Sequence, residues 1–253
     1  MTVLETKNLG IAFGGLQALQ DVHFSIEEGE IVGLIGPNGA GKTTVFNLLT
    51  DVYMPTEGVI QLDGKNIVGK KTYQITQNGM ARTFQNIRLF KDISVIDNVK
   101  IAMNFQMKYS VLSGIFRLPS YWKEEKAATE RAYELLKVLH LEELADDLAK
   151  NLPYGQQRKL EIARALAANP KVLLLDEPAA GMNPTETMEL METIALIRDK
   201  FKVAVLLIEH DMNFVMGICE HIVVLDYGRI IAEGNAEEIR NNKKVIAAYL
   251  GGE

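Results

Sequence analysis

A glycine-rich segment in the first fifty residues has the composition and spacing of a loop that binds phosphate. Residues 36–44 read GPNGAGKTT, directly after the apolar run IVGLI and before the segment VFNLL, which is expected to begin a helix. Glycines let consecutive backbone N–H groups curl around phosphate oxygens, and the start of a helix adds a favourable dipole. The residues expected to contact a nucleotide in this phosphate loop are Gly36, Pro37, Asn38, Gly39, Ala40, Gly41, Lys42, Thr43 and Thr44.

The side chains of the phosphate loop indicate a nucleoside triphosphate bound with a metal ion. Lys42 supplies a cation for the outer phosphates, and Thr43 offers a hydroxyl to Mg²⁺. The fingerprint of dinucleotide-binding proteins does not fit, because the glycines fall as G-x-x-G-x-G rather than G-x-G-x-x-G. A chance glycine turn of this form is expected in roughly one per cent of chains of this length.

Two acids at the end of an apolar run are candidates for the hydrolytic chemistry. The run Val172–Asp176 reads VLLLD, and Glu177 follows it directly. Asp176 is placed to hold Mg²⁺ or its waters, and Glu177 to polarise a water for in-line attack on the γ-phosphate. An isolated Asp-Glu pair is more often two solvated acids, but in a chain with a phosphate loop we expect the catalytic role.

Three further segments carry polar groups whose roles depend on that site. His210 ends the apolar run at residues 203–208, where it can stabilise the γ-phosphate, although a lone histidine at a strand end is usually structural. Gln85 is a candidate ligand of Mg²⁺ or its water rather than a plain surface amide. Residues 152–156 precede an expected helix over 158–168, so they form either a second anion site or a plain helix cap with Pro153.

The apolar pattern predicts the elements that position these groups. Short continuous runs rich in Val, Ile and Leu read as strands of a parallel sheet buried on both faces. The first thirty residues and residues 58–67 alternate instead, which predicts a smaller antiparallel sheet. We expect the parallel strands at residues 31–36, 172–176, 203–208 and 222–225, and helices at 123–141 and 185–201. The expected division is a nucleotide-binding α/β core at 1–91 and 161–235, a helical insertion at 92–160 and a helical tail at 236–253.

Composition sets the class of protein. The 253 residues are 47% hydrophobic and 24% charged, which are ordinary globular values, and 27 − 33 gives a net charge of −6. We therefore expect no nucleic-acid partner held by bulk charge. The single cysteine, Cys219, excludes an intramolecular disulfide framework and suits a reducing compartment. The start MTVLETKNLG does not read as a signal segment, so we expect a soluble intracellular protein.

Taken in this order, the motifs resemble the ATP-binding cassette family, the motor subunits of ABC transporters. The resemblance implies an α/β fold with a layered, RecA-like P-loop NTPase core, an N-terminal antiparallel β subdomain and an inserted helical subdomain. It implies ATP and Mg²⁺ as cofactors and ATP hydrolysis as the activity. The site residues it implies beyond the phosphate loop are Gln85, the signature residues Leu152, Gly155 and Gln156, Asp176, Glu177, His210 and, stacked on adenine, Phe13. The metal would be held by Thr43, Gln85 and Asp176.

The sequence departs from the family pattern at two places. The signature serine is replaced by Pro153, followed by Tyr154, and the loop after Glu177 ends in Asn183 where the family usually has aspartate. The segments DEPAAGMNP, IEHDMNFVM and AAYLGG resemble the corresponding sequences of the ATPases of branched-chain amino-acid transporters.

The resemblance also implies partners. Two cassettes, identical or sister subunits, would pack head to tail with each nucleotide between a phosphate loop and the partner's signature. Transmembrane permeases would contact the segment around Gln85, at the cytoplasmic face of the cell membrane. Three alternatives are a soluble cassette ATPase of translation or DNA repair, a cassette for another solute, and a GTPase. The GTPase is disfavoured because residues 242–245 read NKKV and lack the aspartate that reads guanine.

Two surface segments stay open at this stage. Residues 103–122 are apolar without clean periodicity, so they either meet the permease or a lipid-facing partner or pack locally within the helical insertion. Arg82, Arg88 and lysines 70, 71 and 91 form a basic cluster that we expect on a solvated face.

Overall fold

The computed structural model describes residues 1–108 and 110–250 and divides into two compact units. The larger unit comprises Met1–Gln85 and Lys171–Glu253, and the helical unit comprises Asn86–Pro170. The domain limits expected from the sequence, with a separate C-terminal tail, stay a prediction. Gly251 and Gly252, which end the text AAYLGG, lie outside the described residues.

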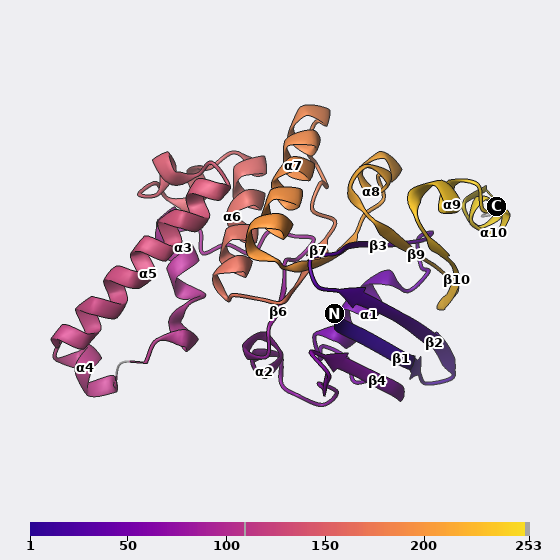
Figure 1. Ribbon diagram of the computed structural model, residues 1–253, viewed down its shortest axis with the longest axis horizontal. Helices are drawn as coiled ribbons and strands as arrows, with labels where there is room; N and C mark the ends of the chain where they lie inside the picture. Colours follow the sequence, from indigo (N-terminus) through magenta and orange to yellow (C-terminus); the bar gives the residue numbers. More distant parts are fainter. Residues whose placement is uncertain (109, 251–253) are drawn as a thin grey trace. The chain divides into compact units, whose positions relative to one another are not determined.

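A six-stranded sheet forms the centre of the larger unit, with the strand order β10-β9-β3-β8-β7-β6 (Figure 1). Its pairs are parallel except the edge pair β9 and β10. The central strands are the continuous apolar runs of the sequence and are buried along their whole length, as strands covered on both faces must be. The strand bounds are β3 Ile31–Ile35, β6 Met80–Arg82, β7 Val172–Asp176, β8 Ala204–Ile208, β9 His221–Asp226 and β10 Arg229–Gly234.

The smaller sheet is antiparallel, as predicted, with the order β2-β1-β4-β5. Its bounds are β1 Thr2–Phe13, β2 Leu16–Glu27, β4 Glu57–Leu62 and β5 Lys65–Asn66. One apolar cluster joins this sheet to the central one through α1 (Lys42–Leu49), whose Phe46 and Leu49 are fully buried. This packing fixes α1, and with it the phosphate loop, against both sheets.

Helices α7 (Pro184–Phe201) and α8 (Met212–Ile218) cover the other face of the central sheet (Figure 1). Leu190, Ile194 and Ile197 recur on one side of α7 and are buried, so the helix predicted over 185–201 is confirmed. The remaining helices of the larger unit are α2 (Thr72–Gln77), α9 (Ala236–Arg240) and α10 (Lys243–Leu250).

The helical unit is built on α3 (Val95–Ile101), α5 (Pro119–Val138) and α6 (Tyr154–Ala167), with the short α4 (Val111–Ile115). The face of α5 predicted from Ala128, Ala132 and Leu135 is buried, but the helix begins earlier, with Pro119 in its first turn, and ends at Val138. The helix expected over 158–168 likewise begins four residues earlier, at Tyr154. The single-turn 3₁₀ segments are Asn104–Gln106, Glu142–Leu144 and Ala149–Asn151.

Among the described residues, every helix falls short of the length and apolarity that a bilayer crossing requires.

The lone thiol gives a test of the packing around β9. Cys219 is 8% exposed, and burial raises the pKa of its thiol to about 12. Because the thiolate is the reactive form, we expect a disulfide reagent at mildly alkaline pH to modify the native protein at least roughly a thousandfold more slowly than an unfolded chain. In urea, the unfolded chain should react at the ordinary rate of a free thiol. The Cys219→Ser variant should not react with the reagent. A fast reaction in native buffer would show that the thiol is accessible.

Candidate active site

The phosphate loop connects the end of β3 to the start of α1, and its backbone fits only glycine at two points. Gly36 has φ 149°, and a Cβ there would lie 2.0 Å from the Leu225 carbonyl oxygen. Gly41 has φ 108°, and a Cβ would lie 2.6 Å from a methyl group of Leu19. The two positions let the main chain turn tightly between the central sheet and β2, which leaves a loop whose backbone forms the cradle.

Lys42 folds back over this loop. Its Nζ donates hydrogen bonds to the carbonyl oxygens of Gly36 at 2.7 Å and Pro37 at 3.0 Å. Burial lowers the pKa of Lys42, and the negative charge of Glu177 opposes that shift. The ammonium group is therefore held at the loop itself, close enough to the acid at the end of β7 to interact with it. Thr43 is exposed beside it and Thr44 is half-buried.

Three residues that the sequence places far apart meet at the carboxylate of Glu177. Gln85 Nε2 donates to Glu177 Oε2 at 2.8 Å, and His210 Nε2 lies 2.7 Å from Glu177 Oε1. The strand order explains the meeting, because β8 lies between β3 and β7 and the carboxyl ends of parallel strands share one edge. Glu177 itself has φ 48°, a left-handed conformation that is uncommon outside glycine, and its N–H donates to the Ile208 carbonyl.

Asp176 is bound by an arginine that sequence reasoning placed on a solvated face. Arg82 Nη2 donates to Asp176 Oδ2 at 2.7 Å, and the two side chains are only 8% and 6% exposed. The same guanidinium donates to Asn47 of α1 at 2.9 Å and to Thr50, the C-cap of that helix, at 3.2 Å. It also lies over the ring of Phe46 at 5.4 Å. The expectation for Arg82 was wrong because β6 has only three residues, too few to show that it pairs with β7 and buries its last side chain.

Glu209, which the sequence analysis did not single out, ties two loops of the site together. Its carboxylate accepts hydrogen bonds from the N–H of Ala179 at 2.7 Å and of His210 at 3.0 Å. Glu209 is 5% exposed, and this burial raises the pKa of its carboxyl group. The sequence does carry a signal for Glu209, which is an acid placed directly after a buried strand and before a candidate histidine.

The departure at Asn183 has a structural role. Its side chain accepts from the N–H groups of Thr185 and Glu186, both at 3.0 Å, and Glu186 accepts from the Asn183 N–H, which forms a capping box at the start of α7. Asparagine and aspartate are about equally good at this position. The replacement therefore keeps the helix cap.

The signature residues lie in the helical unit, at the start of α6. Leu152 and Gly155 are buried, Gln156 is half-buried and Tyr154 is exposed. Pro153 precedes the helix in an extended conformation without a side-chain cap, and Gln157 donates to the Leu152 carbonyl at 2.8 Å. The phosphate loop lies in the larger unit, so the two motifs belong to different units of one chain.

Phe13 ends β1 with a ring that is available for stacking. The residue is 45% exposed, and its ring meets Tyr53 edge-on at a centroid distance of 5.2 Å. An opening of about 1000 Å³ is lined in part by the phosphate loop, with Asn38, Tyr227 and Tyr249 among its residues. A hydrogen bond also links Tyr249 to the Gly36 main chain.

Comparisons with known proteins match these features to one family over most of the chain. Residues 19–180 match the family described as "ABC transporter", and residues 229–253 match one described as "Branched-chain amino acid ATP-binding cassette transporter". The high-affinity branched-chain amino acid transport ATP-binding protein BraF of Pseudomonas aeruginosa is 48% identical over 249 residues, or 98% of each chain.

Solved structures show the same architecture. The crystal structure of the ADP conformation of an ATP-binding cassette of an ABC transporter has a TM-score of 0.86 and 33% identity, with 100% of both chains covered. A dimeric cassette in a post-hydrolysis state bound to ADP and Pi has a TM-score of 0.76 and 27% identity, and covers 92% of this chain and 98% of that one. These likenesses confirm the predicted fold class.

The Arg82–Asp176 pair leads to a stability prediction. Removing one partner of a buried ion pair leaves the other charge uncompensated, so Arg82→Gln should lower the free energy of unfolding by about 3 kcal/mol in a urea titration. The double variant Arg82→Gln, Asp176→Asn should lose much less free energy of unfolding than the sum of the two single variants, because both charges of the pair are then removed. Lys91→Gln, at an exposed site, is the matched control and should change the value by no more than about 0.5 kcal/mol. Additive effects would mean that the two side chains are not coupled.

Proposed function

This chain belongs to the ATP-binding cassette family of ABC transporters, and from that premise we propose that it drives the import of branched-chain amino acids. It is an ATPase of that family. The proposal on the solute is supported by the name of the BraF relative and by the match of residues 229–253 to a family named for branched-chain amino acids. The solute would not contact this subunit, so the support for this solute comes from sequence similarity along the whole chain and not from the site residues.

ATP, the substrate, would be held by the larger unit. The N–H groups of the phosphate loop would donate to the phosphate oxygens, and Lys42 would leave its two carbonyl partners for the outer phosphates. Phe13 would stack on adenine, since its ring is exposed at the end of β1.

The residues near the loop fit a magnesium ion. Mg²⁺ prefers oxygen ligands, and Thr43, Gln85 and Asp176 offer a hydroxyl, an amide and a carboxylate oxygen. When bound, the ion would neutralise charge on the phosphate oxygens. Arg82 of β6, itself bound to Asn47 of α1, holds Asp176 in place, so the carboxylate would be oriented before any ligand arrives.

The observation that carries the hydrolytic role is the carboxylate of Glu177 between Gln85 and His210. Glu177 would accept the proton of the attacking water, and His210 would stabilise the γ-phosphate as charge develops. The hydrogen bonds from both neighbours orient the carboxylate, and the Lys42 ammonium adds a positive charge nearby. These groups together have the types and positions that in-line attack on a phosphoryl group requires.

The signature would complete the site of a second cassette. The start of α6, with Leu152, Gly155 and Gln156, presents backbone N–H groups and a helix dipole that favour an anion. A related cassette is dimeric with ADP and Pi, which supports a head-to-tail pair with the same chain or a sister subunit. Permease subunits would contact the segment around Gln85 and hold the chain at the cytoplasmic face of the membrane.

The role of Glu177 is tested by Glu177→Gln. The amide keeps the size of the side chain but is no base and has one acceptor oxygen instead of two, so ATP binding should persist while the hydrolysis rate falls by about a hundredfold or more. Calorimetry measures the binding and phosphate release measures the turnover. Glu143→Gln, at an exposed site of the helical unit, is the matched control and should hydrolyse normally. Normal turnover in Glu177→Gln would exclude Glu177 as the base.

The solute is tested with the assembled transporter. We expect vesicles that contain this chain with its co-expressed permeases to take up labelled leucine, isoleucine and valine in an ATP-dependent way. Charged amino acids, and vesicles with Glu177→Gln, serve as controls. ATP-dependent uptake of a different solute class, or an active ATPase that never associates with a permease, would contradict the proposal.

A further inference from the structure

The tip of the helical unit exposes a group of large apolar side chains. They lie in α4 and in the segments that flank it, and Leu112, Ile115 and Phe116 are 65%, 67% and 70% exposed. We call this surface the α4 tip, which consists of Phe105, Leu112, Ile115, Phe116, Leu118 and Trp122. Scattered apolar residues are normal on a protein surface, but a group of six within eighteen residues of chain marks an interaction site.

Local hydrogen bonds hold the α4 tip in this exposed arrangement. Ser110 caps α4 by accepting the N–H of Ser113 at 3.2 Å, and the Ser113 carbonyl accepts the N–H of Leu118 at 3.0 Å. Arg117 turns the chain with φ 47°, after which α5 begins. The buried Ser113 side chain also bonds to Ser120, so the turn is closed from inside and its apolar side chains face outward.

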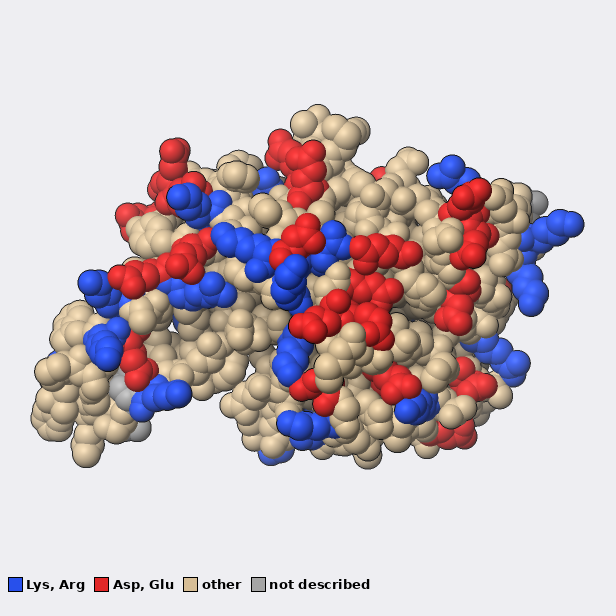
Figure 2. Space-filling view, viewed as in Figure 1, with Lys and Arg blue, Asp and Glu red and all other residues tan. Residues whose placement is uncertain are grey.

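Basic residues outnumber acidic ones around the α4 tip, where Glu124 accepts a hydrogen bond from the Lys108 N–H at 2.7 Å. Residues 98–123 contain four Lys or Arg and no Asp or Glu, in a chain whose net charge is −6. Lys100 pairs with Glu125 at 3.0 Å, whereas Lys108, Arg117 and Lys123 are exposed around the apolar side chains. In Figure 2 the end that carries α4 is largely uncharged, and both basic and acidic side chains lie at its border.

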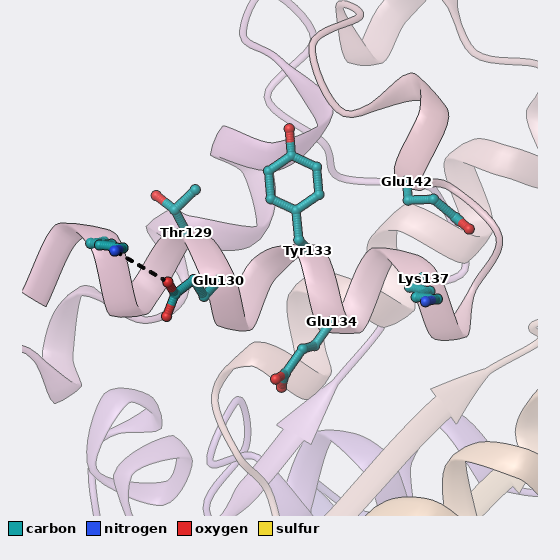
Figure 3. A pocket seen from close by; sticks show the side chains of 7 residues that line it. Thr129, Glu130, Tyr133, Glu134, Lys137 and Glu142 are labelled. Atoms are coloured by element: carbon teal, nitrogen blue, oxygen red, sulfur yellow. Dashed lines mark ion pairs between the residues drawn. The ribbon is translucent and has the colours of Figure 1, made fainter.

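The neighbouring surface of α5 is different in character. Acidic and basic side chains alternate there, with an ion pair between Arg131 and Glu134 at 3.2 Å. A shallow depression of about 710 Å³ on this helix is lined by Tyr133 between Glu130 and Glu134 (Figure 3). The excess of positive charge is therefore confined to the α4 tip and does not extend along the helix.

We propose that the α4 tip binds the surface of a membrane that contains anionic lipids. Trp122 has one polar edge, which favours the boundary between headgroups and acyl chains, and the exposed apolar ring of Phe116 would enter the acyl side of that boundary. Lys108, Arg117 and Lys123 would contact the negative headgroups, and these three cations outnumber Glu124, the acid that is bound to the Lys108 N–H. The inference rests on the proposed function, because that function places the chain beside a membrane permease.

The chain carries its own probe for this contact, because Trp122 is its single tryptophan. The full-length protein, without permease, is mixed with vesicles of phosphatidylcholine in which about a third of the lipid is phosphatidylglycerol. We expect the Trp122 emission to shift to shorter wavelength and the protein to float with these vesicles. Vesicles of phosphatidylcholine alone should bind it about tenfold more weakly, and added salt should weaken the binding.

Variants separate the α4 tip from the rest of the surface. Leu112→Ser with Phe116→Ser, and separately Arg117→Glu with Lys123→Glu, should each reduce flotation with anionic vesicles about tenfold or more. Tyr133→Ser is the matched control, since it removes an exposed aromatic residue of α5 among acids, and it should bind as the parent does. Circular dichroism and the ATPase rate should be unchanged in all three, because none of these residues belongs to the active site.

Two results would overturn the proposal. One is the absence of flotation and of any Trp122 shift with anionic vesicles, while the complex with permeases hydrolyses ATP and transports normally; the proposed function then stands and the lipid contact does not. The other is a Trp122 shift that needs the permease and is the same in neutral lipid, which would assign the α4 tip to a protein partner.

Discussion

The hydrogen bonds that hold the Glu177 carboxylate are the constraint on which the rest of the site depends. They require that Gln85 after β6, Glu177 after β7 and His210 after β8 all reach one edge of the sheet, at the side of the phosphate loop after β3. Only a parallel sheet places four strand ends together in this way, and a parallel sheet must be buried on both faces. The short, continuous apolar runs, the covering helices α7 and α8 and the antiparallel sheet that packs against α1 are consequences of that need.

Charge is balanced locally around this edge. Asp176 is neutralised by Arg82, Lys42 lies near Glu177, and Glu209 binds backbone N–H groups. Each buried charge therefore has a partner, which is the condition under which charges persist in an interior. The arrangement also connects the elements: Arg82 joins β6 and β7 to α1, and Glu209 joins the end of β8 to the loop after Glu177. A ligand that moves one of these loops would act on the others through groups already in contact.

How much of this could be predicted from the sequence depends on how local each signal is. The phosphate loop and the Asp176–Glu177 strand end are contiguous motifs, and the central strands are continuous runs, so fold class and the main elements were accessible. The burial of Arg82 was not, because it depends on the pairing of the three-residue β6 with β7, which no periodicity reveals. Helix starts were missed at Pro119 and Tyr154, because the first turns, PSYW and YGQQ, show no helical periodicity of apolar residues. The stacking role of Phe13, the metal ligands and the domain limits stay predictions.

The left-handed backbone at Glu177 has a consequence for anyone who engineers this protein. A residue with a Cβ is strained in that conformation, and glycine is not, so the wild-type side chain is kept against a local loss of stability. Selection for heat resistance alone would favour glycine at position 177, and such proteins would lack the carboxylate that we propose as the catalytic base. Directed evolution of this scaffold therefore needs a readout of turnover in every round.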